Sequence, residues 1–328
     1  MSGAMLLPPG RAAGIYLRHA MLALFSLALL WWLAGLGAGH WAVPRWEDPL
    51  VRQLRVPRLI NALLVGAALA CSGAALQALF RNPLADPGLI GTSAGAALGV
   101  ILVLAGGLSG LSVPLAAFGG GLLVTLAIVA LNRLVGGGLA GLLILGVVVG
   151  ASCGAVVGLL LLMSDDLVLR GATNWLAGSL AQWRGGDAIY VLPLMGLGFA
   201  ILLATARDLD CLLLGDDTAR SMGVDLIRVR TLTAVGAALL TGGAVTLSGI
   251  IGFVGMMIPN AVGVFCRRSR RALMLWSAWA GAVFLLLIDC VAREVAYPVD
   301  LPAGAVAALV GPACFLWIFW RLQRGHRD

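Results

Sequence analysis

Three arginines at the ends of apolar segments are the residues best suited to recognition chemistry. Arg55 and Arg58 precede a long apolar run, and Arg293 follows another, four residues after Asp289. A guanidinium is a planar fork of N–H donors that pairs well with carboxylates. The three side chains could therefore bind acidic groups of a soluble partner. Snorkelling, or an ion pair of Arg293 with Asp289 or Glu294, explains the same pattern, and the residues alone leave both readings open.

A polar turn with two prolines interrupts the apolar sequence at residues 81–88, which read RNPLADPG. Pro83 forbids continuation of the preceding helix, and Asp86 before Pro87 is suited to cap the next one. A well-built helix connection explains most of this turn. It does not explain the polar side chains around it, since polar groups of membrane helices tend to face a bundle interior or a water-filled path. We predict a pathway-lining role for this set: Ser72, Gln77, Asn82, Thr92 and Ser93.

The segment 214–230 has the pattern of a helix, a break and a second helix. Asp216 and Asp217 suit a helix start, where the helix dipole favours negative charge. Gly223 suits the position after a helix end, and Asp225 can cap the helix that follows. Two short capped helices would make a rigid projection, and a rigid projection can transmit force.

Enzyme chemistry has little support in this sequence. Asp165 and Asp166 resemble half of a metal–diphosphate site, but no second acidic motif accompanies them. All 22 basic residues are arginine, so the chain lacks the lysine that a P-loop needs. The six cysteines form no C-x-x-C pair, and the three histidines lie outside the apolar runs. We predict no catalytic residue, metal site or cofactor on this chain.

The elements that must position these residues are membrane-spanning helices. The chain is 61% hydrophobic and 11% charged, whereas soluble domains are about a quarter charged. Its apolar runs last roughly 20 residues, which is typical of membrane helices and unlike barrel strands. We predict an all-α membrane protein with ten spans. The runs are 21–37, 59–80, 89–106, 113–131, 139–163, 189–206, 232–247, 250–266, 273–288 and 303–320.

Arginine distribution gives the orientation of these spans. Arg267, Arg268, Arg270 and Arg271 form the densest basic cluster, and arginines in short loops mark the cytoplasmic side. Both termini are then cytoplasmic, and the net charge of +7 reflects topology, not nucleic-acid binding. We predict one transmembrane domain over residues 21–321, between cytoplasmic tails of residues 1–20 and 322–328.

The residues described so far are similar to those of a known family. The chain resembles, from about residue 52 to 321, the FecCD permeases, which are subunits of type II ABC importers for iron–siderophore complexes, heme and cobalamin. The matching motifs are Arg-x-Pro-Arg at 55–58, Ser72-Gly73 with Gln77, Asn82-Pro83-Leu84-Ala85 with Pro87-Gly88, Leu214-Gly215 through Gly223, Gly252-Phe253-Val254-Gly255 with Pro259, Asp289 with Arg293, and Leu301-Pro302 with Gly304.

This resemblance implies a multi-subunit machine in the bacterial inner membrane. The expected partners are a second copy of the chain, two ATP-binding cassette ATPase subunits, a periplasmic substrate-binding protein and membrane lipid. ATP and Mg²⁺ would bind the ATPase subunits, and this chain would have no ATPase site of its own.

The resemblance also implies roles for individual residues. Arg55, Arg58 and Arg293 would dock the binding protein, and Asn82 and Leu84 would form an inner gate beside the pathway residues Ser72 and Gln77. The residues that would couple to the ATPase are Leu214, Gly215, Asp216, Asp217, Ala219, Arg220, Gly223 and Val224.

Two positions depart from the family pattern. Many relatives have His after the proline that corresponds to Pro259, whereas this chain has Asn260. Relatives often carry Ser or Thr at the start of the fifth span, where this chain has Leu139 and Ala140. We therefore expect no protonation role at Asn260. In relatives the Ser or Thr of the fifth span is part of a second inner constriction, and the resemblance does not extend that role to Leu139 and Ala140.

The function that we predict is import of a bulky metal chelate, with heme as the preferred substrate. The run FRNPLADPGLIG is similar to that of heme importers. Ferric siderophores and cobalamin are alternatives within the family. An ion-coupled secondary transporter is the alternative from another class, but it needs ionisable residues in mid-span, and Asp289 is the best candidate for one.

Overall fold

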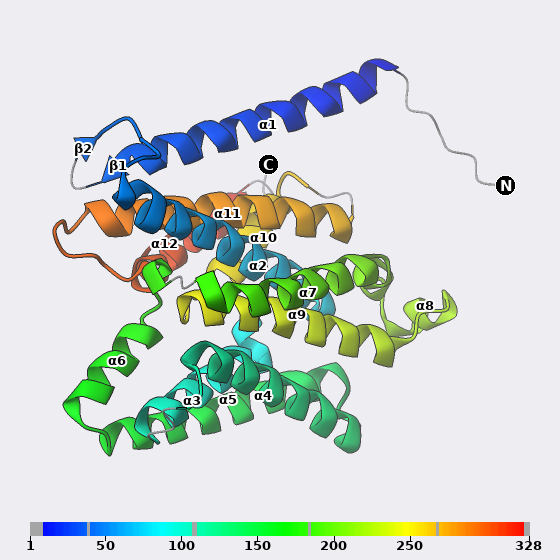
Figure 1. The fold of residues 1–328 in the computed structure, drawn as a ribbon. Helices are drawn as coiled ribbons and strands as arrows, with labels where there is room; N and C mark the ends of the chain where they lie inside the picture. Colours follow the sequence, from blue (N-terminus) through cyan, green and yellow to red (C-terminus); the bar gives the residue numbers. More distant parts are fainter. Residues whose placement is uncertain (1–8, 38–39, 107–109, 183–184, 267–268, 325–328) are drawn as a thin grey trace.

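A computed structural model of the chain describes residues 9–37, 40–106, 110–182, 185–266 and 269–324. These residues are mostly helical (Figure 1). The α-helices are α1 (Pro9–Gly35), α2 (Val56–Phe80), α3 (Thr92–Ala105), α4 (Val113–Val135), α5 (Gly138–Leu162), α6 (Asp166–Leu176), α7 (Gly185–Leu212), α8 (Asp216–Ser221), α9 (Leu226–Ser248), α10 (Val254–Gly263), α11 (Arg270–Glu294) and α12 (Ala303–Arg324). The shorter elements are a hairpin of β1 (Leu36–Gly37) and β2 (His40–Trp41), a π-helical turn η1 (Val51–Arg55), and 3-10 turns η2 (Pro87–Ile90) and η3 (Leu180–Gln182).

The predicted spans correspond to helices of this structure. Six helices are long and apolar enough to cross a membrane: Val51–Phe80, Val113–Val135, Gly138–Leu162, Ala188–Leu212, Leu226–Ser248 and Arg270–Glu294. Four shorter apolar helices, Met21–Gly35, Thr92–Ala105, Val254–Gly263 and Ala303–Leu316, match the remaining predicted runs. Boundaries differ at both ends of the chain. Helix α1 begins at Pro9 and α12 runs to Arg324, so both expected tails, 1–20 and 322–328, are partly helical. Residues 1–8 and 325–328 lie outside the described residues.

Helices α2 and α9 form the centre of the molecule. In their most apolar windows 78% and 83% of residues are buried, against 22% in α5 and 28% in α4. Helix α2 packs against both α11 and α9, and α7 packs against α9 (Figure 1). Helices α3, α4 and α5 pack together beside this centre.

Glycines allow the backbone of α2 to approach two neighbouring helices closely. A Cβ atom on Gly66 would lie 2.2 Å from the carbonyl oxygen of Gly281 in α11. A Cβ atom on Gly73 would lie 1.9 Å from the carbonyl oxygen of Gly255 in α10. Only glycine fits at these crossings, and small residues are the usual means of close helix packing in lipid.

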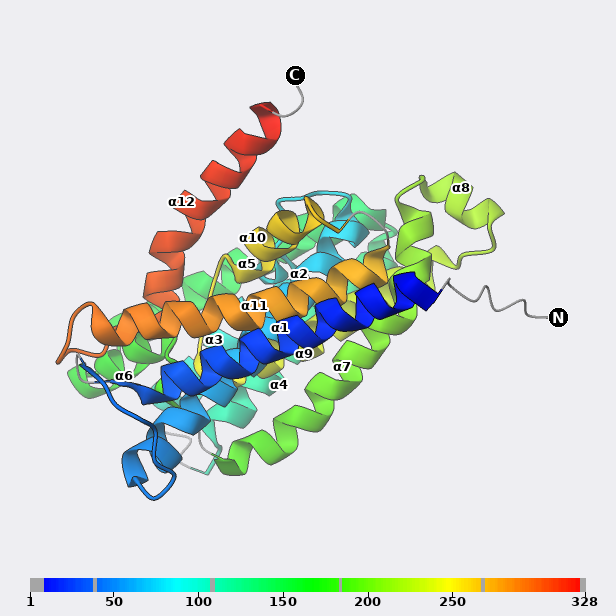
Figure 2. The same ribbon diagram turned by 90° about the horizontal axis from the view of Figure 1, so that it is seen from above.

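The two ends of the bundle carry different elements (Figures 1 and 2). The β1–β2 hairpin, η1 and α6 lie at one end. Helix α8 projects from the other end, where α1 also begins. Helix α12 starts near α6 and diverges from the remaining helices (Figure 2).

Candidate functional site

The three predicted docking arginines lie together at the end of the molecule that carries α6. Nε of Arg58 donates a hydrogen bond of 2.7 Å to Oδ1 of Asp289, which is fully buried. Nε of Arg293 lies 3.3 Å from the other carboxylate oxygen of Asp289. Arg55 donates to the carbonyl oxygen of Ala34 at 3.1 Å. We call Arg55, Arg58 and Arg293 the arginine cluster.

A second carboxylate, which the sequence analysis missed, completes the cluster. Nη1 and Nη2 of Arg58 donate to the two carboxylate oxygens of Asp300 at 2.6 and 3.0 Å. All three arginines and Asp300 line a cavity of about 240 Å³. The only sequence signal for Asp300 is its place directly before the Leu301-Pro302 motif.

Ion pairs within the chain, which the sequence allowed as an alternative to docking, are present at the arginine cluster. The side chains of Arg58 and Arg293 are only 11% and 12% exposed, and both pair with Asp289. The pairing of Arg293 with Asp289 is therefore real. It does not exclude docking, because the cavity that the arginines share opens beside Tyr297 and Pro298, which are exposed.

The turn at residues 81–88 is held by its own side chains. Helix α2 ends at Phe80, and Arg81 adopts the left-handed conformation with φ of 49°. Oδ1 of Asn82 accepts a hydrogen bond of 2.9 Å from the backbone N–H of Leu84. Asp86 caps η2 by accepting from the backbone N–H of Gly88, as predicted. Burial raises the pKa of Asp86, and this hydrogen bond from Gly88 lowers it in part.

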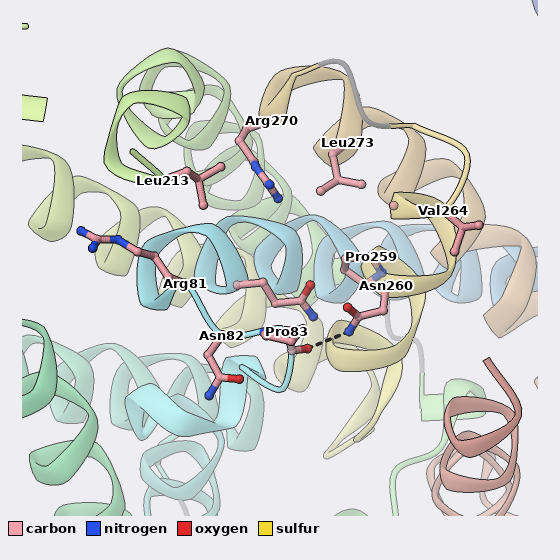
Figure 3. A pocket seen from close by; sticks show the side chains of 11 residues that line it. Arg81, Asn82, Pro83, Leu213, Pro259, Asn260, Val264, Arg270 and Leu273 are labelled. Atoms are coloured by element: carbon pink, nitrogen blue, oxygen red, sulfur yellow. Dashed lines mark hydrogen bonds between the residues drawn. The ribbon is translucent and has the colours of Figure 1, made fainter. Parts of the chain in front are cut away.

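Side chains of α2 and α10 fasten this turn from the other side. Nε2 of Gln77 donates to the carbonyl oxygen of Ala85 in the turn at 3.4 Å and to that of Met256 in α10 at 2.9 Å. Nδ2 of Asn260 donates to the carbonyl oxygens of Pro83 and Met256, both at 2.7 Å (Figure 3). The amide of Asn260 therefore connects α10 to the turn.

A cavity of about 390 Å³ lies against the turn and opens at the α8 end. Figure 3 shows its lining, with the guanidinium of Arg81 directed away from Asn260. Gln77 and Asn82 line this cavity, and Leu84 on the same turn is 53% exposed. Gln77 and Asn82 therefore lie at one opening, whereas Leu84 is exposed on the same turn and is not among the residues that line the cavity.

Ser72 lies elsewhere. It has no exposed surface, and its hydroxyl contacts the hydroxyl of Thr241 at 3.0 Å and donates to the carbonyl oxygen of Ala237. Thr92 is buried in the same way, and its hydroxyl contacts that of Thr125 at 2.8 Å. Within this protomer, Ser72 and Thr92 hold helices together and do not face an open path.

The segment 214–230 has the predicted order of a helix, a break and a second helix, but only the first of these, α8, is short. Asp216 and Asp217 occupy the first turn of α8, and Gly223 has the left-handed φ of +85° expected after a helix end. Asp225 accepts a hydrogen bond of 3.0 Å from the backbone N–H of Arg228. This cap begins α9 itself, so the second predicted helix is the start of a membrane span.

Asp216 connects α8 to two other elements. Its carboxylate oxygens accept hydrogen bonds from Arg81 and Arg230. Desolvation raises the pKa of Asp216, but the positive charges of Arg230 and Arg81 outweigh this effect and leave the pKa below its usual range. The carboxylate is therefore charged at neutral pH.

Metal or enzyme chemistry gains no support from the part of the chain that the structure describes. It contains no group of three or more His, Cys, Asp or Glu side chains placed to hold a metal ion. Asp165 caps α6 by accepting from the backbone N–H of Val168 at 2.9 Å. The Asp165-Asp166 pair thus has a structural explanation.

Comparison with known proteins agrees with the resemblance. The model of the FecCD transport family matches residues 19–321. The hemin transport system permease protein HmuU of Yersinia pestis is 40% identical over 285 residues, which cover 84% of this chain and 84% of that protein. The Fe(3+) dicitrate permease FecC of Escherichia coli is 36% identical over 293 residues, or 86% of each chain. The vitamin B12 permease BtuC of Vibrio cholerae is 38% identical over 287 residues, covering 85% and 84%.

Solved structures show the same fold. An inward-facing conformation of a metal-chelate-type ABC transporter matches with a TM-score of 0.82 and 30% identity, covering 92% of this chain and 97% of that one. PsaBC from Streptococcus pneumoniae matches with a TM-score of 0.58 and 17% identity, covering 84% and 94%, and supports the fold alone. The predicted fold of a type II ABC importer permease is thus confirmed, and the chain is a member of the FecCD transport family.

Proposed function

We propose that this chain is the membrane-spanning subunit of an ATP-driven importer for a metal chelate, with heme as its substrate. Two copies would form the pathway, two ATPase subunits would bind at the α8 end, and a periplasmic binding protein would dock at the arginine cluster. ATP and Mg²⁺ would bind the ATPase subunits. Both chain termini would lie on the cytoplasmic side of the bacterial inner membrane.

The observation that carries this proposal is the placement of the two sets of family residues at opposite ends of the molecule. The arginine cluster lies with α6 at one end, and α8 projects from the other beside the 81–88 turn (Figures 1 and 2). A binding protein and an ATPase act from opposite sides of a membrane, and this arrangement offers each of them a separate surface.

Support for heme comes from the relatives. The hemin permease HmuU is 40% identical, against 36% for FecC and 38% for the Vibrio cholerae BtuC. Ferric siderophores and cobalamin therefore remain competing substrates of the same machine, and the experiment must include all three.

An ion-coupled mechanism receives less support. The best ionisable candidate within a span, Asp289, is fully buried, and both of its carboxylate oxygens lie against arginines. A carboxylate that binds and releases a coupling ion needs access to that ion. The positive charges of Arg58 and Arg293 instead neutralise the negative charge of Asp289 where it is buried.

Transport by the reconstituted complex tests the proposal. The chain would be purified with its ATPase subunits, placed in proteoliposomes and supplied with the binding protein, and uptake of hemin, a ferric siderophore and cobalamin would be measured in competition. We expect ATP-dependent uptake of hemin that persists when ionophores remove ion gradients. Uptake driven by a gradient without ATP would overturn the importer, and preferred uptake of another chelate would overturn heme alone.

A further inference from the structure

One carboxylate joins three elements at the α8 end of the molecule. Asp216 is the first residue of α8, and its Oδ1 accepts a hydrogen bond from Nη2 of Arg81. Its Oδ2 accepts one from Nη2 of Arg230. Arg81 is the residue where α2 ends and the 81–88 turn begins, whereas Arg230 lies in the second turn of α9. Two arginines from different elements therefore hold the two oxygens of one side chain.

This contact differs from an isolated surface ion pair. The side chains of Asp216 and Arg81 are 36% and 35% exposed, and that of Arg230 is 19% exposed. An isolated exposed ion pair contributes little to stability. A carboxylate that accepts hydrogen bonds from two guanidiniums is held in place from two sides. The neighbouring Asp217 is 99% exposed and pairs within α8, with Arg220 at 3.5 Å. Asp216 is therefore the acidic residue of α8 that reaches the other elements.

Arg81 continues into a turn that has little freedom to bend. Asn82 accepts from the backbone N–H of Leu84 at 2.9 Å, and Asn260 donates to the carbonyl oxygen of Pro83 at 2.7 Å. These hydrogen bonds tie Asn82, Pro83 and Leu84 to one another and to α10, so a pull on Arg81 would act on the turn as one unit.

We infer that Asp216 is a positioning residue that passes a displacement of α8 at the same time to the 81–88 turn and to α9. The inference rests on the proposed function, in which partner ATPases move α8 and the turn closes the inner end of the pathway. Through Arg81 the movement reaches the gate residues Asn82 and Leu84. Through Arg230 it reaches α9, one of the two central helices.

The test separates transport from ATP hydrolysis. Asp216→Asn, Arg81→Gln and the double variant would be reconstituted with the ATPase subunits and binding protein. The ratio of chelate molecules imported to ATP molecules hydrolysed would then be measured, using hemin or whichever chelate the unmodified complex imports. We expect each single variant to lower this ratio about tenfold, as loss of coupling between two sites does. Asp216→Asn removes the contacts to both Arg81 and Arg230, whereas Arg81→Gln removes only the first of them. The double variant should therefore be no worse than Asp216→Asn alone.

A matched control removes another arginine contact to α9. Arg133 at the end of α4 donates to the hydroxyl of Thr231 at 2.6 Å, next to Arg230, and has an exposed side chain. Arg133→Gln should leave the ratio unchanged. Assembly of each variant would be checked by co-purification of the ATPase subunits, and Arg81→Gln alters the contact without changing α8.

The outcomes distinguish the two proposals. Import by the unmodified complex with unchanged ratios in Asp216→Asn and Arg81→Gln overturns this inference alone. A parallel fall of hydrolysis and import in Asp216→Asn also overturns it, because Asp216 would then only hold the ATPase. No ATP-driven import of any chelate by the unmodified complex overturns the proposed function and this inference with it.

Discussion

At the scale of single residues, the two carboxylates that pair with the arginine cluster differ in burial. Asp289 has no exposed surface and compensates both Arg58 and Arg293. Removing one partner from such a network leaves a buried charge unpaired, which is strongly destabilising. Asp300 is different, because its side chain is 50% exposed and lies in a loop. It occupies the two terminal nitrogens of Arg58 that a carboxylate of a docking protein would need.

Asp300→Asn should therefore strengthen docking of the binding protein. The variant frees the guanidinium fork of Arg58 from a competing carboxylate, while Asp289 still holds its Nε atom. A partly exposed ion pair contributes up to about 1 kcal/mol, so we expect roughly a fivefold lower Kd for the binding protein, measured with the reconstituted complex in nanodiscs.

The matched control for this experiment is Asp48→Asn, which removes an acidic charge from the loop before η1. Asp48 accepts from the backbone N–H of Leu50 and does not contact Arg58. A Kd that stays unchanged in Asp300→Asn, or a Kd that falls equally in both variants, would refute the competition between Asp300 and a docking carboxylate.

Part of the candidate site could be predicted at this scale, but its contacts between distant residues could not. Sequence spacing predicted the cap at Asp86, the helix break at Gly223 and, as one alternative, the ion pair of Arg293 with Asp289. The contact between Arg58 and Asp300 joins residues 242 positions apart, and Asn260 reaches Pro83 across 177. No local pattern contains such a pairing, because it depends on which helices become neighbours.

At the scale of elements, hydropathy identified the spans but not their burial. Runs of about 20 apolar residues are required by bilayer thickness, whatever the neighbours of the helix. The mean hydropathy is 2.5 for α5 and 2.0 for α2, although α2 is central and α5 is mostly exposed in the protomer. Burial is also why the pathway role predicted for Ser72 is not seen in this protomer. The sequence shows a polar residue within a span, but it does not reveal that Thr241 of α9 lies beside it.

The close crossing of α2 and α11 leads to a prediction about stability. A Cβ atom on Gly281 would lie 2.4 Å from the carbonyl oxygen of Gly66 and 2.5 Å from Cβ of Ala70. Gly281→Ala should force the helices apart and destabilise the protein by about 1–3 kcal/mol. The change would be measured as a lower thermal midpoint of the purified protein in detergent.

Gly196→Ala in α7 provides the comparison, because a Cβ atom there would meet nothing within 4 Å. Alanine favours a helix over glycine by up to about 1 kcal/mol, so this variant should be neutral or slightly more stable. Equal thermal midpoints for the two variants would mean that the α2–α11 crossing is not tightly packed.

At the scale of the whole molecule, the two ends present different chemistry. The arginine cluster and its cavity lie at one end, and α8 projects at the other (Figures 1 and 2). Charge reversal at Arg58 would place a new carboxylate against Asp289 and Asp300 and disturb folding. Arg55 is only half-buried and is therefore the better position for a docking test.

Arg55→Glu should remove most of the stimulation of ATP hydrolysis by the binding protein. A reversed charge repels acidic docking groups and leaves them unpaired, and truncating one partner of an interfacial charge pair typically weakens binding by about 2–5 kcal/mol. ATP hydrolysis by the reconstituted complex would be measured while the concentration of binding protein is increased. Arg52→Glu, at an exposed residue of the same η1 turn, should retain the stimulation. Full stimulation in Arg55→Glu would contradict docking at the cluster.

The two glycine crossings of α2 restrict how the protein can move. They lie seven residues apart, at Gly66 on α11 and at Gly73 on α10, which is about 10 Å along the helix axis. The first crossing brings α11 into backbone contact with α2, and the second does the same for α10. A force applied to either end of α2, at Arg58 or at Arg81, would therefore be shared with two neighbouring helices and would not be confined to α2.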